Sequence, residues 1–168
     1  SLYIIEGDSL QFEVIHTDSL GIHWNSSLGG DKKLQKMFPN IPLEGNENLV
    51  VVHSAVNGKA INIKDLNNVE GFDFSGTKKF DKHTGYCCRS FLTVPMKNHE
   101  NKVIGVLQII NRCDGESFSE EDQHIVESLA SQAAVTLTNK ELIADLHDMF
   151  ESFIRALGDA IDSKSKYT

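Results

Sequence analysis

The stretch that decides the fold is TGYCCRSFLTVPMKNHENKVIGVLQIINR, residues 84–112. Within it, residues 90–96 and 102–110 are rich in β-branched and aliphatic side chains, which predicts two strands. The polar residues between them predict a turn, so that the two strands pair as neighbours. The second strand is apolar on both faces, apart from Gln108, and this pattern is typical of a central strand that is covered on both sides.

Shorter runs predict the rest of the sheet. Residues 2–6 and 10–16 are rich in β-forming side chains and flank a Gly-Asp-Ser turn signal, which predicts a hairpin. Residues 60–63 predict one more short strand. Residues 48–56 predict a short helix that ends at an Asn-Gly pair, although their valines leave a strand as an alternative.

Two polar segments separate these elements. Residues 17–47 contain glycines and prolines and are too long for an ordinary turn, and long loops are where binding residues tend to lie. Residues 67–84 predict an irregular segment. It carries Phe72, Phe74 and Phe80, which are more often core residues than ligand contacts.

A long helix is predicted from Ser119 onward. Ser119 is a good N-cap, and Asp122 supplies a capping-box-like acid three residues later. An apolar face runs to residue 137 and resumes after residue 139 with steps of three and four, the spacing of a coiled coil. The resumed stripe consists of Leu142, Leu146, Met149, Phe153, Leu157 and Ala160. It predicts a parallel homodimer through residues 142–157.

Composition excludes several classes of function. The formal charge of −8 argues against nucleic acid or an anionic membrane as the main partner, because both require a cationic face. The sequence has no signal peptide and no apolar run near the roughly 20 residues of a membrane span. Its cysteines, odd in number and two of them adjacent, make a poor disulfide framework and indicate a reducing cytoplasm. Because the chain opens inside a strand-like run without Met, we interpret it as a fragment of a longer protein.

No catalytic signature is present: there is no Walker loop, nucleophile elbow, H-E-x-x-H or zinc-type cysteine spacing. One alternative is a cluster that binds a metal or haem or senses redox state, made of His83, Cys87 and Cys88. Isolated His and Cys residues are more often structural, however. We therefore predict no enzyme activity, no metal and no resident cofactor, with a thiol sensor at the adjacent cysteines as a weaker alternative.

Residues 84–112, preceded by NIKD at 62–65, resemble the GAF domains of cyclic-nucleotide phosphodiesterases and of bacterial signalling proteins. The resemblance covers nearly all of residues 1–137. It implies an α+β, GAF/PAS-like fold, with an antiparallel sheet of about six strands flanked by helices and a long C-terminal signalling helix. We divide the chain into a GAF sensor domain at 1–138, truncated at the start of its first strand, and a linker helix at 139–168.

The resemblance also implies which positions face a ligand. Carried over from cyclic-nucleotide-binding relatives, these are Ser1, Ile15, His16, Thr84, Cys88 and Gln108. Ile15 replaces a stacking aromatic and Cys88 replaces a hydroxyl donor, which weighs against cyclic AMP or cyclic GMP but leaves the pocket. Gln108 supports a pocket independently, since an unsatisfied buried amide costs about 1–3 kcal/mol, and a ligand, a water or neighbouring backbone would satisfy it. Phe74, Phe80 and Arg89 complete the candidate set.

Two further matches concern the C-terminal half. The Asn-Lys…Phe…Asp-Glu signature of phosphodiesterase GAF domains corresponds to Asn111-Arg112, Phe118 and Asp122-Gln123, which we interpret as scaffold between the last strand and the helix. FIRALGDAIDSKSKYT, residues 153–168, resembles the start of HD and HD-GYP phosphohydrolase domains. It implies that a sensor domain controls a covalently linked metal-dependent phosphohydrolase through a dimeric helix; the alternative is a dimerisation module with a vestigial pocket.

Overall fold

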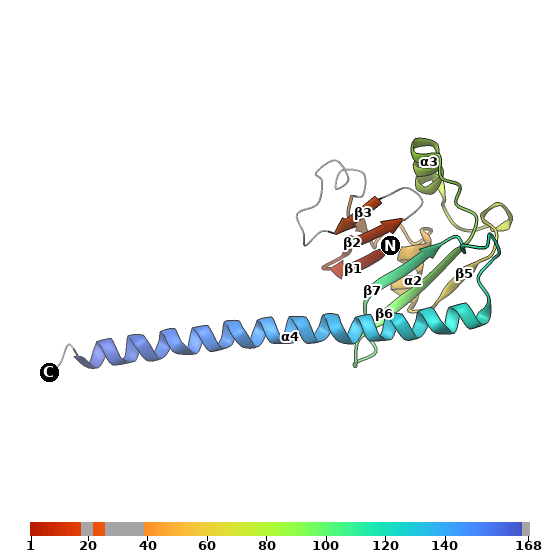
Figure 1. The fold of residues 1–168 in the computed structure, drawn as a ribbon. Coiled ribbons are helices and arrows are strands. Elements are labelled where there is room, and N and C mark those ends of the chain that lie inside the picture. Colours follow the sequence, from red (N-terminus) through yellow and green to blue (C-terminus); the bar gives the residue numbers. More distant parts are fainter. Residues whose placement is uncertain (18–21, 26–38, 166–168) are drawn as a thin grey trace. The chain divides into compact units, whose positions relative to one another are not determined.

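The computed structural model describes residues 1–17, 22–25 and 39–165 (Figure 1). Parts of the predicted 17–47 loop, residues 18–21 and 26–38, therefore lie outside the described residues, as do residues 166–168 at the end of the HD-like text. The chain divides into two compact units, Ser1–Ala134 and Val135–Thr168.

An antiparallel sheet forms the first unit, with its strands in the order β3-β2-β1-β7-β6-β5 (Figure 1). A further short strand, β4, pairs with β2. The strands are β1 (Leu2–Glu6), β2 (Ser9–Thr17), β3 (Ile22–Asn25), β4 (Ile41–Pro42), β5 (Ile61–Ile63), β6 (Phe91–Lys97) and β7 (Val103–Ile110). The predicted antiparallel sheet of about six strands is confirmed, and β7 is central, between β1 and β6.

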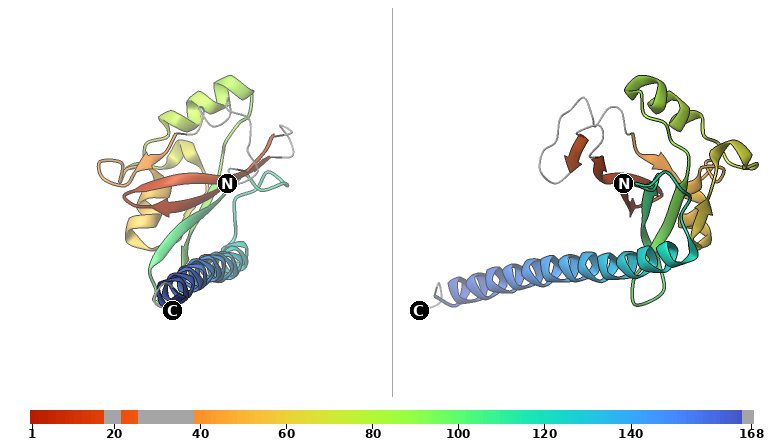
Figure 2. Two further views of the ribbon diagram at one scale, coloured as in Figure 1. Left: turned by 90° about the vertical axis from the view of Figure 1, so that its left-hand side faces the viewer. Right: turned by 45° about the vertical axis from the view of Figure 1, so that its right-hand side comes forward.

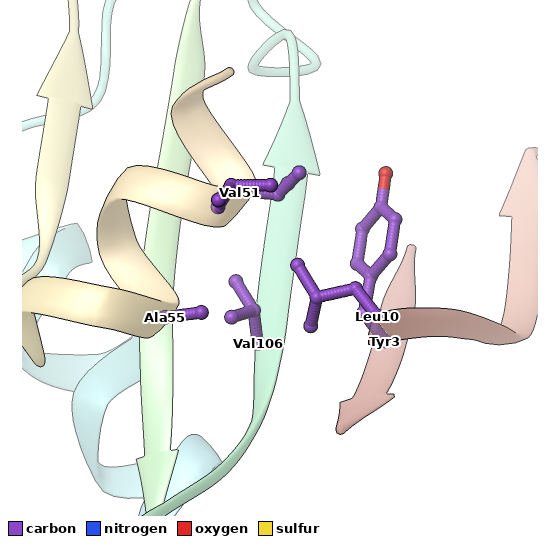
Figure 3. Close-up of a cluster of buried hydrophobic side chains, with 6 residues drawn as sticks. Tyr3, Leu10, Val51, Ala55 and Val106 are labelled. Carbon is purple, nitrogen blue, oxygen red and sulfur yellow. The ribbon is translucent and has the colours of Figure 1, made fainter. Parts of the chain in front are cut away.

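The valine-rich segment is a helix, which settles the alternative left open by its sequence. Helix α2 (Val50–Asn57) ends at Gly58, whose φ of 60° places it in the left-handed region that glycine tolerates. The helix lies against β6 and β7 (Figure 2). Its apolar side chains complete a core with three strand residues, and burial there outweighs the strand propensity of valine. That core consists of Tyr3, Leu10, Val51, Val52, Ala55 and Val106 (Figure 3).

The prediction that residues 67–84 are irregular is wrong. A 3₁₀ turn, η3 (Leu66–Asn68), is followed by a helix, α3 (Ser75–Thr84). The Asp73 carboxylate accepts from the backbone N–H of Ser75 at 2.8 Å, and Gly85 ends the helix in the left-handed region. No residue of α3 is buried, so the helix is fixed by its polar ends rather than by an apolar face that periodicity would reveal.

Helix α4 (Glu120–Ser165) begins as predicted. The Ser119 hydroxyl accepts from the backbone N–H of Asp122 at 3.1 Å, and the Asp122 carboxylate accepts from the backbone N–H of Ser119 at 2.8 Å, which confirms the capping box. These bonds from Ser119, together with the nearby charge of Arg112, hold the pKa of Asp122 below its usual value. Within the first unit, Val126, Ala130 and Ala134 are buried at steps of four residues, as expected for one face of a helix.

In the second unit, α4 presents many exposed apolar side chains. They are Val135, Leu142, Ile143, Leu146, Met149, Phe150, Phe153, Ile154, Leu157 and Ile161. Across the described ranges, no helix is both long enough and apolar enough to cross a membrane.

Candidate functional site

The buried amide of Gln108 has protein partners. Its Nε2 donates to the Thr93 hydroxyl on β6 at 3.1 Å, and the Tyr3 hydroxyl on β1 donates to its Oε1 at 3.5 Å. All three side chains are buried, and burial raises the pKa of Tyr3, which keeps its hydroxyl a donor. Ser1, directly before β1, pairs with Gln108 through the backbone, and its carbonyl accepts at 2.9 Å. The amide therefore has partners without a ligand.

Two of the predicted ligand positions are neighbours on β2. Ile15 is buried and His16 is exposed, because successive side chains of a strand point to opposite faces of the sheet. The pair therefore does not face one site together.

Thr84 completes the end of α3. Its hydroxyl donates to the carbonyl of Phe80 at 2.9 Å and accepts from the backbone N–H of Tyr86 at 3.3 Å. Both polar functions of this hydroxyl serve the turn between α3 and the segment that leads into β6. Phe80 itself is partly buried.

A cavity of about 520 Å³ is lined in part by that same segment. Its walls come from the end of β5 and η3, from α3, from the residues before β6, and from the connection between β7 and α4. The lining residues are Lys64, Asp65, Leu66, Asn67, Phe74, Thr77, Lys78, Asp81, Cys87, Cys88, Arg89, Ser90, Gly115 and Glu116. This cavity brings together Phe74, Cys88 and Arg89 of the predicted set. Ser1, Ile15, His16, Phe80, Thr84 and Gln108 do not line it.

One side chain, Asn111, fixes the wall formed by residues 87–90. Its Oδ1 accepts from the backbone N–H groups of Arg89 and Ser90, at 2.7 and 3.2 Å, and its Nδ2 donates to the Cys87 carbonyl at 2.7 Å. Asn111 has a φ of 55°, a conformation that asparagine adopts more readily than most residues. The wall is also joined to η3, because the backbone N–H of Leu66 donates to the Arg89 carbonyl at 2.9 Å.

The charged groups of the cavity differ in how they are paired. Asp65 accepts from Asn67 and Asn68, and Asp81 accepts from the backbone N–H of Cys88 at 2.9 Å. In the described part of the chain, the three cations of the lining, Lys64, Lys78 and Arg89, form no ion pair with a carboxylate. Asp65 and Asp81 are therefore engaged by protein donors, whereas the three cations remain available to a ligand.

Cys88 is held as a thiol. Its Sγ lies 3.0 Å from Oδ1 of Asp81, to which it donates. Burial, and then the hydrogen bond and charge of Asp81, raise the pKa of Cys88 well above its usual value. Because the thiolate is the reactive form, this environment weighs against a thiol sensor at Cys88.

We expect Cys88 to be alkylated by iodoacetamide at pH 8 at least ~10-fold more slowly than the exposed Cys87, because a tenfold loss of thiolate follows each unit by which a pKa rises. Asp81→Asn should narrow the difference by removing the negative charge. Peptide mass spectrometry of quenched samples measures both rates, and denatured protein provides the control in which they should converge. Equal rates in the folded protein would contradict this description of the thiol.

Within the described ranges, no three His, Cys, Asp or Glu side chains converge as a possible metal-binding group.

Three residues of the cavity and its wall were not identified as site residues from the sequence: Lys64, Asp81 and Asn111. Asp81 lies on α3, a helix whose local sequence signals are Asp73, which accepts from the backbone N–H of Ser75 at its start, and Gly85 at its end. Asn111 was recognised as part of a motif, but its contact with residues 87–90 depends on its left-handed conformation.

The remaining residues of that motif confirm its interpretation as scaffold. The Arg112 guanidinium donates to the Asp122 carboxylate at 2.8 Å, which joins the end of β7 to the first turn of α4. Phe118 is buried, and its carbonyl accepts from Nδ2 of Asn62 on β5 at 3.1 Å.

Known proteins resemble this chain in both sequence and fold. Over 90 residues it is 36% identical to the dual 3′,5′-cyclic-AMP and -GMP phosphodiesterase 11 of Drosophila melanogaster, a match that covers 54% of this chain and 6% of that enzyme. The GAF domain of a two-component sensor histidine kinase from Bacillus halodurans superposes with a TM-score of 0.56 at 21% identity, covering 85% of this chain and 82% of that one. The GAF domain of a phosphoenolpyruvate-protein phosphotransferase from Coxiella burnetii has a TM-score of 0.57 at 14% identity, with 86% and 73% covered. The GAF domain family model matches residues 3–137, and the chain therefore belongs to the GAF domain family of small-molecule-sensing regulatory domains.

Proposed function

We propose that this domain binds a small anionic molecule in the 520 Å³ cavity and transmits its occupancy to α4, without catalysing a reaction. The observation that carries the proposal is the cavity itself, whose volume lies within the roughly 300–1,000 Å³ of small-molecule sites. Its three unpaired cations, Lys64, Lys78 and Arg89, attract negative charge, and Phe74 supplies a buried apolar surface.

The chemistry of the lining favours a phosphate-bearing ligand of the nucleotide class. Guanidinium groups bind phosphate oxygens with good geometry, and an aromatic ring offers a face to a base. The related fly enzyme acts on cyclic AMP and cyclic GMP, as its name states. Ile15 and Cys88 remain departures from cyclic-nucleotide binders, so we favour a related nucleotide over these two.

A continuous set of contacts supports transmission from the cavity to α4. Gly115 and Glu116 line the cavity a few residues before the helix begins. Asn111 holds the wall at residues 87–90, and the adjacent Arg112 binds Asp122 in the first turn of α4. A ligand that shifts either wall would therefore act directly on the start of the helix, which is the differential contact that allosteric coupling requires.

We further propose that α4 forms a parallel homodimer and leads to an HD-type phosphohydrolase domain. The exposed apolar side chains in the second unit support the first part, and the resemblance of residues 153–168 supports the second. The three free cysteines suit a cytoplasmic location. Ligand binding would then alter the pairing of the two helices and, through it, the linked domain.

The test of ligand binding is a thermal-shift panel of cyclic AMP, cyclic GMP, AMP, GMP and inorganic phosphate. A ligand at 100 times its Kd stabilises the native state by about 2.7 kcal/mol, so a phosphate-bearing compound should raise Tm by several degrees. The double variant K64A/R89A should lose the shift, whereas K59A/K102A, which removes the same charge from exposed positions outside the cavity, should keep it. No shift with any compound, or equal loss in both variants, would contradict the proposal.

One observation favours the alternative of a dimerisation module with a vestigial pocket. Gln108, Thr84 and Cys88, three of the positions carried over from nucleotide-binding relatives, are engaged by the protein itself. If that alternative holds, no compound in the thermal-shift panel raises Tm, and the chain is still dimeric.

A further inference from the structure

Two histidines face each other across neighbouring strands at the edge of the sheet. His16 on β2 and His23 on β3 are directly paired in the antiparallel register. Their Nδ1 atoms lie 2.7 Å apart, and their ring centroids are 4.3 Å apart at an interplanar angle of 52°. Both residues are exposed, and neither lines the 520 Å³ cavity.

We propose that His16 and His23 form a binding site for a divalent late transition metal such as Cu²⁺, Ni²⁺ or Zn²⁺, with the two Nδ1 atoms as ligands and water in the remaining positions. Imidazole nitrogen suits these metals, whereas Mg²⁺ and Ca²⁺ prefer oxygen. The pairing of β2 with β3 presents both rings from one face of the sheet, so the site does not require a further element of the fold.

The geometry requires little adjustment. Metal–nitrogen bonds of about 2.0–2.1 Å at angles between square and tetrahedral place two cis nitrogens about 2.9–3.4 Å apart. The observed 2.7 Å separation widens to this range by a small rotation of either ring. In an Nδ1–H···Nδ1 bond between two neutral rings, one Nδ1 carries the proton and the other accepts it. When the metal binds, the donor ring changes to its Nε2–H tautomer, so that both rings coordinate the metal through Nδ1.

Isothermal titration of the untagged 168-residue chain with NiCl₂ tests the site. We expect one Ni²⁺ per chain, with affinity at least ~10-fold lower in H16Q and in H23Q, because either change leaves a single imidazole ligand. H99Q and H124Q, which remove exposed histidines elsewhere, are matched controls and should bind as the parent does.

A spectroscopic measurement distinguishes the site from general histidine binding. With one equivalent of Cu²⁺, the electron paramagnetic resonance spectrum should show hyperfine coupling to two nitrogens, which becomes one in H16Q or H23Q. Unchanged affinity in both variants, or an equal loss in H99Q and H124Q, would overturn the proposal. Because the readout is metal affinity, its failure leaves the nucleotide panel unaffected.

Discussion

The variant G105A should lose a large part of its folding stability. Gly105 lies on β7, paired with Ile4 of β1 on one side and with Met96 of β6 on the other. A Cβ at this position would overlap the backbone carbonyl oxygen of Tyr3 and the side-chain methyl of the fully buried Met96. The Met96 side chain is fully buried and has no space to move into, and the Tyr3 carbonyl is part of the β1 backbone. Strands β1, β7 and β6 would therefore have to move apart.

Overpacking of a core costs about 1–3 kcal/mol and occasionally more, and here backbone as well as side chain must move, so we expect at least ~3 kcal/mol. This is a large part of the roughly 5–15 kcal/mol that stabilises a typical domain. Urea unfolding followed by circular dichroism measures the loss. G76A is the matched control, because Gly76 lies on α3 with open space around it, and alanine there should be neutral or slightly stabilising. Similar midpoints for G105A and the parent would contradict the sheet register.

Charge placed on the apolar stripe of α4 should convert a dimer into a monomer. Leu146 and Phe153 lie seven residues apart, and their side chains are 60% and 58% exposed in the single chain. A repeat of seven places them at equivalent positions of a coiled coil, where each would be buried against the partner helix. Burying one such side chain contributes about 1.5–3 kcal/mol, and a charge there also carries a cost of desolvation.

We therefore expect L146E/F153E to raise the dimer dissociation constant at least ~100-fold. Light scattering coupled to size exclusion, from low to high micromolar protein, measures it. S152E adds one negative charge next to the stripe at a polar position and should remain dimeric. A monomeric parent chain at high micromolar concentration, or a double variant that stays dimeric, would contradict the proposed partner.

The sequence predicted the elements whose stability comes from regular apolar patterns. The strands at residues 90–96 and 102–110 and the capped start of α4 appear within one residue of their expected bounds, because alternation, turn residues and caps are local properties. Helix α3 was missed for the converse reason. It buries no side chain, and its two ends are set by Asp73 and Gly85 rather than by an apolar stripe.

The candidate site was harder to predict because it depends on contacts between distant segments. Resemblance placed ligand positions on β2 and β7, yet Gln108 is satisfied by Tyr3 and Thr93. The cavity instead depends on Asp81 contacting Cys88 across a turn and on Asn111 reaching back to residues 87–90. Such contacts follow from where α3 and the end of β7 lie, which no local pattern specifies.

The most direct test of the central claim is to locate the bound ligand by backbone amide chemical shifts. The compound with the largest thermal shift in the nucleotide panel would be titrated into isotope-labelled protein. We predict that the perturbed amides cluster at residues 64–67, 77–81 and 87–90, with a smaller response at Gly115 and the start of α4. Perturbations centred instead on Thr93 and Gln108, or none at saturating ligand, would contradict a sensor site in this cavity.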